Sequence, residues 1–176
     1  MRTINVKLVG MSPLLMHRYP LEQTKKPEML SREEQAEMSA YRGEDGCLFI
    51  PGVAFQSAFI NAATYSKGKG KSSLQKNTVA GLFVEEFALP LGVKTYMIDS
   101  RRVVNKATKG AIIRHRPRIE NWSVDIHLNY DETLLRESEV RQIVDDAGRR
   151  VGVLDYRPWC KGPFGRFQVN HWQVMK

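Results

Sequence analysis

The segment Trp122-Ser-Val-Asp-Ile-His-Leu-Asn-Tyr130 decides how the rest of the sequence is interpreted. Apolar side chains occupy every second position from Trp122 to Tyr130, and polar side chains fill the positions between them. This period of two is typical of a half-buried β-strand, whose apolar face packs on a core and whose polar face meets water. The segment therefore predicts a sheet with one covered face.

Three further strands are predicted around it. Residues 3–9 alternate in the same way, with Ile4, Val6 and Leu8 on one face. We expect a second strand from Lys94 to about Val104 and a last one from Arg166 to Val174. On the two strands with the clearest alternation, the outward positions are polar, and they are Asn5, Lys7, Ser123, Asp125, His127 and Asn129.

Helices are predicted between these strands. Pro51 opens a helix whose apolar residues, from Phe55 to Ala62, recur at helical spacing. A second long helix is predicted from Leu135 to Arg150, because Val140, Ile143, Val144 and Ala147 share one face. Shorter helices are expected from about Leu74 to Leu82, and from a capping box at Ser31 to about Arg42.

The order strand, helix, strand, strand, helix, strand predicts one α+β domain over residues 1–176, with a ferredoxin-like split βαβ core and both long helices on one face. Two segments are expected outside this core. Residues 11–46 form a polar insertion after the first strand. Residues 101–121 form a basic β-hairpin between the second and third strands, with its tip at 105–110.

The charge of the chain is concentrated in two segments. Residues 101–118 hold seven Lys and Arg without an acidic residue, and residues 66–78 hold four Lys without one. These eleven cations exceed the net charge of +8 by three, so the rest of the chain carries a net −3. Such a distribution favours an anionic partner such as nucleic acid, although a ribosomal or membrane surface would also fit.

The sequence indicates neither a metal site nor a membrane anchor. Cys47 and Cys160 form no CxxC pair and have no histidines at ligand spacing, so no disulfide framework, metal or cofactor is expected. The start of the sequence lacks an apolar leader, and no apolar stretch approaches the roughly 18 residues of a membrane helix. We therefore expect a cytoplasmic protein with no membrane partner.

The cations of the predicted hairpin suit a phosphate backbone, because arginine offers paired donors and each neutralised phosphate releases counterions. The alternative is a solvated hairpin with scattered charge. The lysine segment has the same two interpretations, a phosphate-binding arm or a soluble loop, with Lys67, Lys69, Lys71 and Lys76 as its cations. The candidate phosphate contacts of the hairpin are Arg101, Arg102, Lys106, Lys109, Arg114, His115, Arg116 and Arg118.

Residues 152–169, GVLDYRPWCKGPFGRFQV, mix glycine, proline, aromatic and cationic residues just before the last strand. Glycine permits close approach of a nucleic-acid backbone, cations can contact phosphates, and aromatic rings can stack on bases. Alternatively, Trp159, Phe164 and Phe167 seal the end of the core. The candidate contacts are Gly162 and Gly165 for approach, Arg157, Lys161 and Arg166 for phosphates, and Tyr156, Trp159 and Phe164 for bases.

Two motifs in this chain resemble those of the RAMP superfamily. Residues 48–60, LFIPGVAFQSAFI, resemble its apolar-Pro-Gly helix start, and residues 162–167, GPFGRF, resemble its glycine-rich loop before the last strand. The basic hairpin occupies the place of the thumb in the backbone subunits of CRISPR effector complexes. The resemblance implies an RRM-like core, guide RNA as ligand, copies arranged head to tail, and other effector subunits as partners.

The chain also departs from that family. It is short, its insertion after the first strand is small, and Val53-Ala-Phe stands where serine or threonine followed by a cation is usual. It could therefore be a divergent relative outside a CRISPR system, for example a nucleic-acid binder of a phage or mobile element. The aromatic residues of a true RRM sheet are missing, so we expect binding by loops and hairpin.

The leading hypothesis is a non-catalytic protein that binds single-stranded RNA, or single-stranded DNA, in repeated copies. The second is a metal-independent endoribonuclease, with His115 and His17 as candidate acid or base. Asp45 and Asp99 are weaker candidates for cleavage, because aspartate is ordinary at turns and strand ends. The third is a protein-interaction module whose charge only favours solubility.

Overall fold

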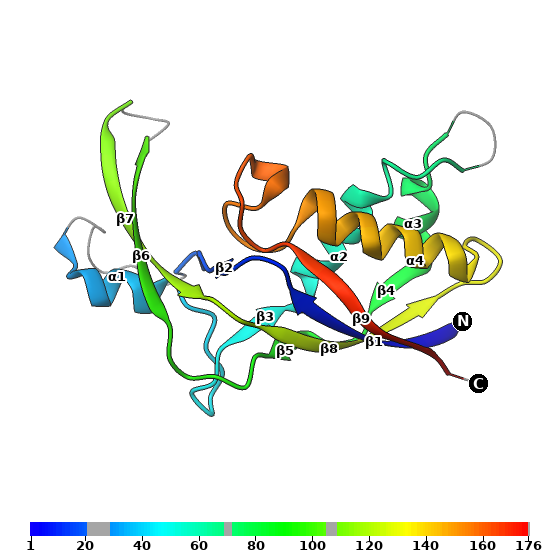
Figure 1. Cartoon of the computed structure of the whole chain (residues 1–176), viewed down its shortest axis with the longest axis horizontal. Helices are drawn as coiled ribbons and strands as arrows, with labels where there is room; N and C mark the ends of the chain where they lie inside the picture. The colour runs from blue at the N-terminus through cyan, green and yellow to red at the C-terminus, as the bar shows by residue number, and fades with distance from the viewer. Residues whose placement is uncertain (21–28, 69–71, 105–108, 176) are drawn as a thin grey trace.

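The computed structural model describes residues 1–20, 29–68, 72–104 and 109–175. It has the mixed α+β architecture that the sequence predicts, with antiparallel sheets and helices (Figure 1). Residues 105–108 of the predicted hairpin tip, with Lys106, and the candidates Lys69 and Lys71 lie outside the described residues.

The main sheet has four strands in the order β4-β8-β1-β9, and all neighbours are antiparallel. The predicted alternation is confirmed, because Ile4, Val6 and Leu8 are buried on β1 and the apolar positions of β8 are buried opposite them. The strands are β1 (Arg2–Gly10), β4 (Leu82–Val84), β8 (Ser123–Tyr130) and β9 (Phe167–Val174).

Helices cover one face of this sheet, as Figure 1 shows for α2 and α4. Phe55 and Phe59 of α2 are fully buried, and Val140, Ile143 and Val144 of α4 pack in the same core. The opposite face carries the polar positions predicted from the sequence, and these are exposed or half-buried. The helices are α1 (Arg32–Met38), α2 (Gly52–Ala62), α3 (Gln75–Gly81) and α4 (Glu137–Asp146).

A second sheet projects from one end of the molecule (Figure 1). Its three strands, in the order β2-β7-β6, are β2 (Leu14–Leu15), β7 (Ala111–Ile119) and β6 (Met97–Val104). β6 and β7 pair antiparallel along their length, and we call this pair the basic ribbon. A small two-stranded sheet joins β3 (Phe49–Pro51) to β5 (Ala88–Pro90).

The second predicted strand is present, but its predicted position in the main sheet was wrong. The strand expected from Lys94 begins at Met97 and pairs with β7 instead of joining the main sheet. The three-residue strand β4 takes the edge position beside β8. A strand this short shows no measurable period in the sequence, whereas β6 is long enough to be recognised as a strand.

The segment 11–46 was expected to lie outside the core, and part of it does not. Leu14, Leu15 and Met16 are fully buried, and β2 pairs with β7. The capping box at Ser31 is confirmed, although the helix ends at Met38 instead of near Arg42. The Arg42 side chain binds Glu37 at 2.6 Å and the carbonyl of Gly46 at 2.6 Å, so it fastens the following turn.

The helix predicted from Leu135 to Arg150 changes from an α-helix to a π-helix near its C-terminal end. α4 stops at Asp146, and residues 147–151 form one π-helical turn. A Cβ on Gly148 would lie 2.1 Å from the carbonyl oxygen of Phe167, so the turn packs directly against the start of β9. None of the helices in the described part of the chain is long and apolar enough to cross a membrane.

Candidate nucleic-acid interface

Four cations of the basic ribbon share one face with the carboxylate of Asp99, whereas Arg102 lies on the other face. In an antiparallel pair, residues directly opposite each other point to the same side of the sheet. Asp99 lies opposite Arg116 and Arg101 lies opposite Arg114, while Arg118 follows two residues after Arg116 on the same side. We call residues 97–101 and 114–119 the ribbon root, and residues 102–104 and 111–113 the ribbon arm.

The segment from Gly152 to Arg166, which we call the glycine loop, folds back on itself in an unusual backbone conformation. Leu154, Tyr156 and Lys161 have φ values of 62°, 48° and 63°, in a region that side chains rarely adopt. A Cβ on Gly162 would lie 1.8 Å from the carbonyl oxygen of Tyr156, so glycine is required there. Strain of this kind persists only where surrounding contacts hold it.

The ribbon root and the glycine loop meet through stacked cations and rings. The guanidinium of Arg101 lies 4.9 Å from the ring centroid of Phe164 and 5.9 Å from that of Tyr156. Arg118 approaches Phe164 at 5.9 Å. These distances are within the range of cation–π attraction. The two segments singled out separately in the sequence are therefore parts of one surface.

A salt-bridge junction fixes the same contact. Arg116 of the root binds Asp155 of the loop, and His17 Nδ1 lies 3.4 Å from the same carboxylate. The backbone N–H of Asp155 also donates to the carbonyl of Leu15 at 3.0 Å. Burial raises the pKa of the Asp155 carboxyl, but the hydrogen bond to His17 and the charge of Arg116 outweigh it and hold this pKa below its usual value.

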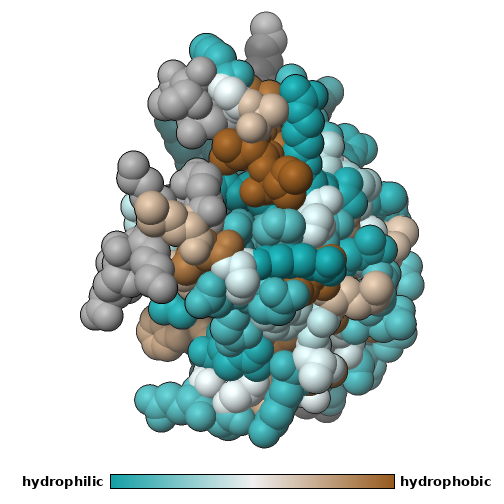
Figure 2. Space-filling view, turned by 90° about the vertical axis from the view of Figure 1, so that its left-hand side faces the viewer, coloured by the Kyte–Doolittle hydropathy of each residue, from teal (hydrophilic) through white to brown (hydrophobic). Residues whose placement is uncertain are grey.

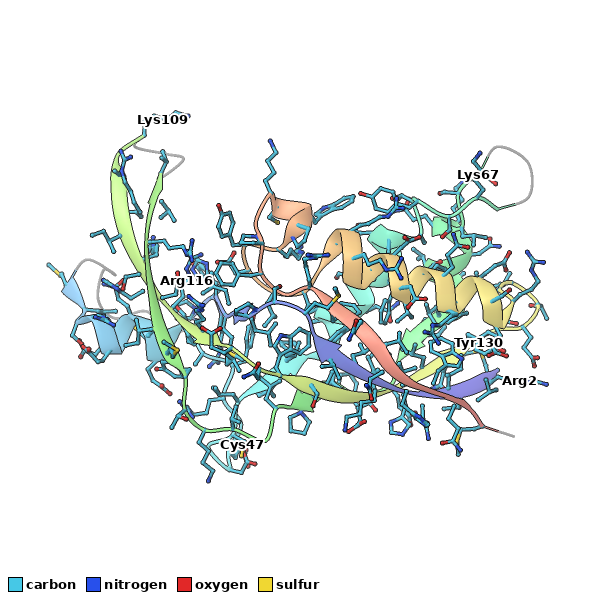
Figure 3. The ribbon with its side chains drawn as sticks, viewed as in Figure 1. Arg2, Cys47, Lys67, Lys109, Arg116 and Tyr130 are labelled. Carbon is cyan, nitrogen blue, oxygen red and sulfur yellow. The ribbon has the colours of Figure 1, made fainter. Side chains whose placement is uncertain are left out.

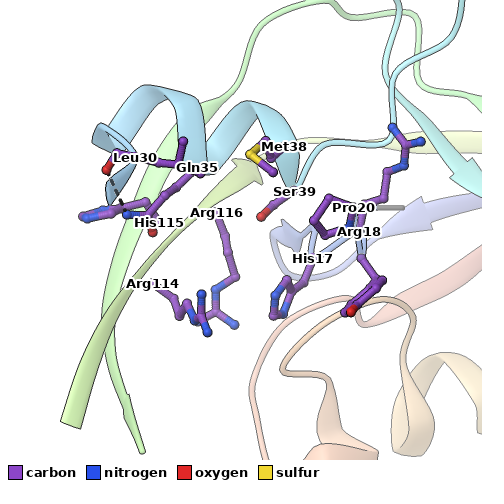
Figure 4. Close-up of a pocket in the computed structure, with 11 residues that line it drawn as sticks. His17, Arg18, Pro20, Leu30, Gln35, Met38, Ser39, Arg114, His115 and Arg116 are labelled. Atoms are coloured by element: carbon purple, nitrogen blue, oxygen red, sulfur yellow. Dashed lines mark hydrogen bonds between the residues drawn. The ribbon is translucent and has the colours of Figure 1, made fainter. Parts of the chain in front are cut away.

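Of the pockets beside this junction, two are lined by the basic ribbon. The smaller, of about 120 Å³, contains no acidic residue in its lining, and Figure 4 shows Arg114, Arg116 and His17 pointing to the same side of it. The larger, of about 620 Å³, is within the usual size of small-molecule sites. It lies between ribbon and glycine loop and is lined by Arg101, Arg102, Val103, Val104, Arg116, Asp155, Tyr156 and Cys160.

Three of the predicted phosphate contacts are tied to carboxylates. Arg101 binds Asp99 through two nitrogens, at 2.6 and 3.0 Å, Arg118 binds Glu120 at 2.6 Å, and Arg116 binds Asp155. The Arg116 side chain is only 7% exposed. Its role is therefore structural first, because a buried cation without a partner is costly.

The other predicted phosphate contacts differ in how far their side chains are exposed. Arg102, Lys109 and Lys161 are exposed, whereas Arg114, His115, Arg157 and Arg166 are half-buried. Arg157 donates to the carbonyl of Leu154 at 2.6 Å and so supports the loop. His115 Nδ1 lies 2.7 Å from Ser100 Oγ and lines the smaller pocket with His17.

The aromatic residues of the glycine loop divide between the two interpretations. Trp159 and Tyr156 are 44% and 38% exposed, so part of each ring is accessible, although the Tyr156 ring also lies 5.9 Å from the Arg101 guanidinium and 6.0 Å from the ring of Phe164. Phe164 and Phe167 are buried, at 4% and 1% exposure, and seal the end of the core as the alternative predicted. Phe164 is therefore not a free stacking surface, because its ring already receives two guanidinium groups.

The lysine segment lies far from this surface. Figure 3 shows Lys67 at one end of the molecule and Lys109 at the other. Lys67 and Lys76 are exposed there, but no described contact joins them to the ribbon. Their shared positive charge gave these cations and the ribbon the same predicted role, but the fold places them at opposite ends of the molecule.

Sequence reasoning missed the carboxylates that organise the site. Asp99 was considered only as a weak cleavage candidate, yet it is 8% exposed and holds Arg101. Asp155 was not singled out, although it is the one acidic residue in the cationic glycine loop. A lone acid within such a loop is a signal that a specific cation from elsewhere pairs with it.

The ribbon arm has a different surface. Val104 and Ile113 are 59% and 61% exposed, and Val103 and Ile112 are half-buried. Figure 2 views the molecule from this end and shows apolar colour toward the top, among hydrophilic neighbours. Exposed apolar groups on a projecting element mark a contact surface more often than a solvated one.

No protein-family model matches the sequence, and none of the curated proteins matches it. Among solved structures, the chain is similar to one chain in the "Cryo-EM structure of the Type III-B Cmr-beta bound to cognate target RNA", with a TM-score of 0.59 and 9% sequence identity. The similarity covers 99% of this chain and 61% of the other, so this chain spans less than two thirds of its length. At this identity the match establishes similarity of fold.

Proposed function

We propose that this protein binds a single strand of RNA along the surface formed by the basic ribbon and the glycine loop. The observation that carries the proposal is the larger pocket, where cations, an exposed aromatic ring and apolar side chains from both segments meet. Phosphates need the cations and bases need the ring, so the lining matches both parts of a nucleotide.

The fold supports placing the protein among RAMP-type subunits. The order β4-β8-β1-β9, with helices on one face, is consistent with a ferredoxin-like or RRM-like split βαβ core. We propose that the ribbon is the inserted thumb of such a core. The similar chain is part of a Type III-B Cmr-beta structure bound to cognate target RNA. We propose a non-catalytic backbone role in a cytoplasmic ribonucleoprotein, with repeated copies and other effector subunits as partners.

The test is the salt dependence of binding to a single-stranded RNA. Arg102→Gln and Lys109→Gln remove two exposed cations that have no described structural partner. We expect weaker binding for every sequence, and a slope of log K against log salt that becomes shallower by about 1.4, since each contact to a single strand contributes about 0.7. Single-stranded DNA of the same sequence shows whether the 2′-hydroxyl contributes.

The matched control removes two exposed lysines elsewhere, Lys7→Gln on β1 and Lys76→Gln on α3. It should leave the slope within error of the unmodified protein. An equal change in both variants would contradict the proposed surface. Wild-type protein without salt-dependent affinity for RNA or DNA would leave the protein-interaction module as the explanation.

A second candidate function is favoured by one observation, that His115 and His17 line the same small cationic pocket. Two imidazoles beside arginines could act as acid and base on a phosphodiester without a metal. RNA cleavage that persists in EDTA and is lost in His115→Ala would support this function. Intact RNA under the same conditions would support binding alone.

A further inference from the structure

The two edge strands of the main sheet, β4 and β9, differ in whether the backbone groups on their outer side are covered. At the β4 edge, the side chain of Gln56 from α2 takes the place of a neighbouring strand. Its Nε2 donates to the carbonyl of Leu82 at 2.7 Å, and its Oε1 accepts from the backbone N–H of Val84 at 2.9 Å. This edge is therefore closed to another strand.

The β9 edge has no such cover. β9 pairs with β1 on one side, and in the described part of the chain no strand pairs with its other side. Other backbone hydrogen bonds reach only the residues that flank it, Arg166 and Met175. Figure 1 shows β9 along the front of the sheet, running from the glycine loop toward the C-terminus. Unpaired strand edges of this length are templates for strand addition.

The sequence of β9 lacks the usual protection of an edge. FQVNHWQV contains no acidic residue, lysine, arginine or proline, although 26% of the chain is charged. Its one irregularity is a shift of register opposite Lys7 and Leu8, which leaves His171 to Val174 in regular pairing. Natural edge strands are normally blunted by charge or proline, so the absence of both here indicates a strand that is paired in the assembled protein.

The partner that fits best is a second copy of the same strand. When identical strands pair antiparallel about a two-fold axis, residue i of one copy lies opposite residue j of the other and residue j lies opposite residue i, so charges of one sign along the strand would face one another. β9 avoids this cost. Its order of residue types is also similar in both directions, with buried or half-buried apolar pairs Phe167–Val169 and Trp172–Val174 at the two ends around a polar centre.

The charge distribution permits this approach. The two strongly basic segments include Lys109 and Lys67, which lie at opposite ends of the molecule in Figure 3, and the remaining chain carries a net −3. Repulsion between two copies at β9 is therefore weaker than the net charge suggests. We propose that two copies associate through β9 in antiparallel orientation, so that their main sheets join into one continuous sheet.

This contact is independent of the proposed RNA binding. It is isologous and closes after two copies, whereas head-to-tail contacts continue without limit. Sedimentation equilibrium of protein freed from nucleic acid should give a dimer. The double variant Gln168→Lys and Gln173→Lys places two charges on exposed positions of β9, and we expect its dimer dissociation constant to rise about tenfold or more.

The control variant, Ser123→Lys with Asp125→Asn, adds the same charge to exposed positions of the interior strand β8 and should dimerise like the wild type. Amide hydrogen exchange in β9 should also slow as protein concentration rises. A monomeric wild type, or equal weakening in both variants, would overturn the proposal. The Arg102→Gln and Lys109→Gln variant should remain dimeric, so failure of RNA binding and failure of dimerisation give different results.

Discussion

The root and the arm of the basic ribbon belong to the same two strands, yet they have opposite surroundings. In the root, Arg101, Arg116 and Arg118 each bind a carboxylate, and two of them also lie over Phe164. In the arm, Val104 and Ile113 are more than half exposed. One basic segment of the sequence therefore contains a ribbon root held by salt bridges and a ribbon arm exposed to solvent.

The difference follows from the cost of burying charge. A guanidinium removed from water needs a carboxylate or several acceptors, so the root requires Asp99 and Asp155. Those pairs leave fewer donors for phosphate. The arm contains no buried charge that needs a partner, so Arg102 in the arm and Lys109 beyond it are exposed for a ligand. The comparison predicts that root variants change stability and that arm variants change binding.

The largest expected effect is at Gly165 in the glycine loop that supports the root. It has φ of 67°, and a Cβ there would lie 2.0 Å from the carbonyl oxygen of Val153. Gly165→Ala must therefore adopt a strained conformation and displace backbone, and we expect a loss of about 3–4 kcal/mol in the free energy of unfolding. Urea denaturation measures it.

Gly92→Ala is the matched control. Gly92 also has positive φ, 69°, but nothing lies within 4 Å of the Cβ position. Conformational strain alone should cost about 1 kcal/mol. Equal losses for both variants would show that the close approach of Gly165 to Val153 contributes nothing to stability.

Asp155→Asn should have the next largest effect. It keeps the size of the side chain but leaves Arg116 buried without an opposing charge. We expect a loss of about 3 kcal/mol, at the low end for broken buried pairs because the Asp155 side chain is 29% exposed. Asp45→Asn, on an exposed turn, is the control and should change stability far less. If Asp155→Asn lowers the free energy of unfolding by less than Asp45→Asn does, the Arg116–Asp155 pair does not stabilise the fold.

The pH dependence of unfolding tests the same junction with a smaller effect. The pKa of Asp155 is lower in the folded protein than in the unfolded chain, so its pair stabilises the fold above about pH 4 and loses this contribution as pH falls further. The difference in stability between wild type and Asp155→Asn should therefore shrink below about pH 4. A constant difference across this range would show that the charge of Asp155 is not what stabilises the root.

The predictable parts of the fold are those in which a periodic pattern of apolar residues continues over a long stretch of sequence. β1, β8, α2 and the core residues of α4 follow from alternation or helical spacing over seven or more residues. β4 was missed because three residues carry no period, and Asp155 was missed because its partner Arg116 lies 39 positions earlier in the sequence. Charge counting identified both basic segments but could not predict that Lys67 lies at the opposite end of the molecule from Lys109.

The smallest expected effect distinguishes the arm from the root most directly. Ile113 and Ile119 lie on the same strand, but Ile113 is 61% exposed and Ile119 is 6% exposed. Ile119→Ala removes buried atoms and should cost about 2–4 kcal/mol, whereas Ile113→Ala should change unfolding by less than about 0.5 kcal/mol. Because Ile113 lies opposite Arg102 in the arm, its loss should weaken RNA binding more than it weakens the fold. If Ile113→Ala destabilises the free protein as much as Ile119→Ala does, the arm is packed in the monomer and is not an open surface for a partner.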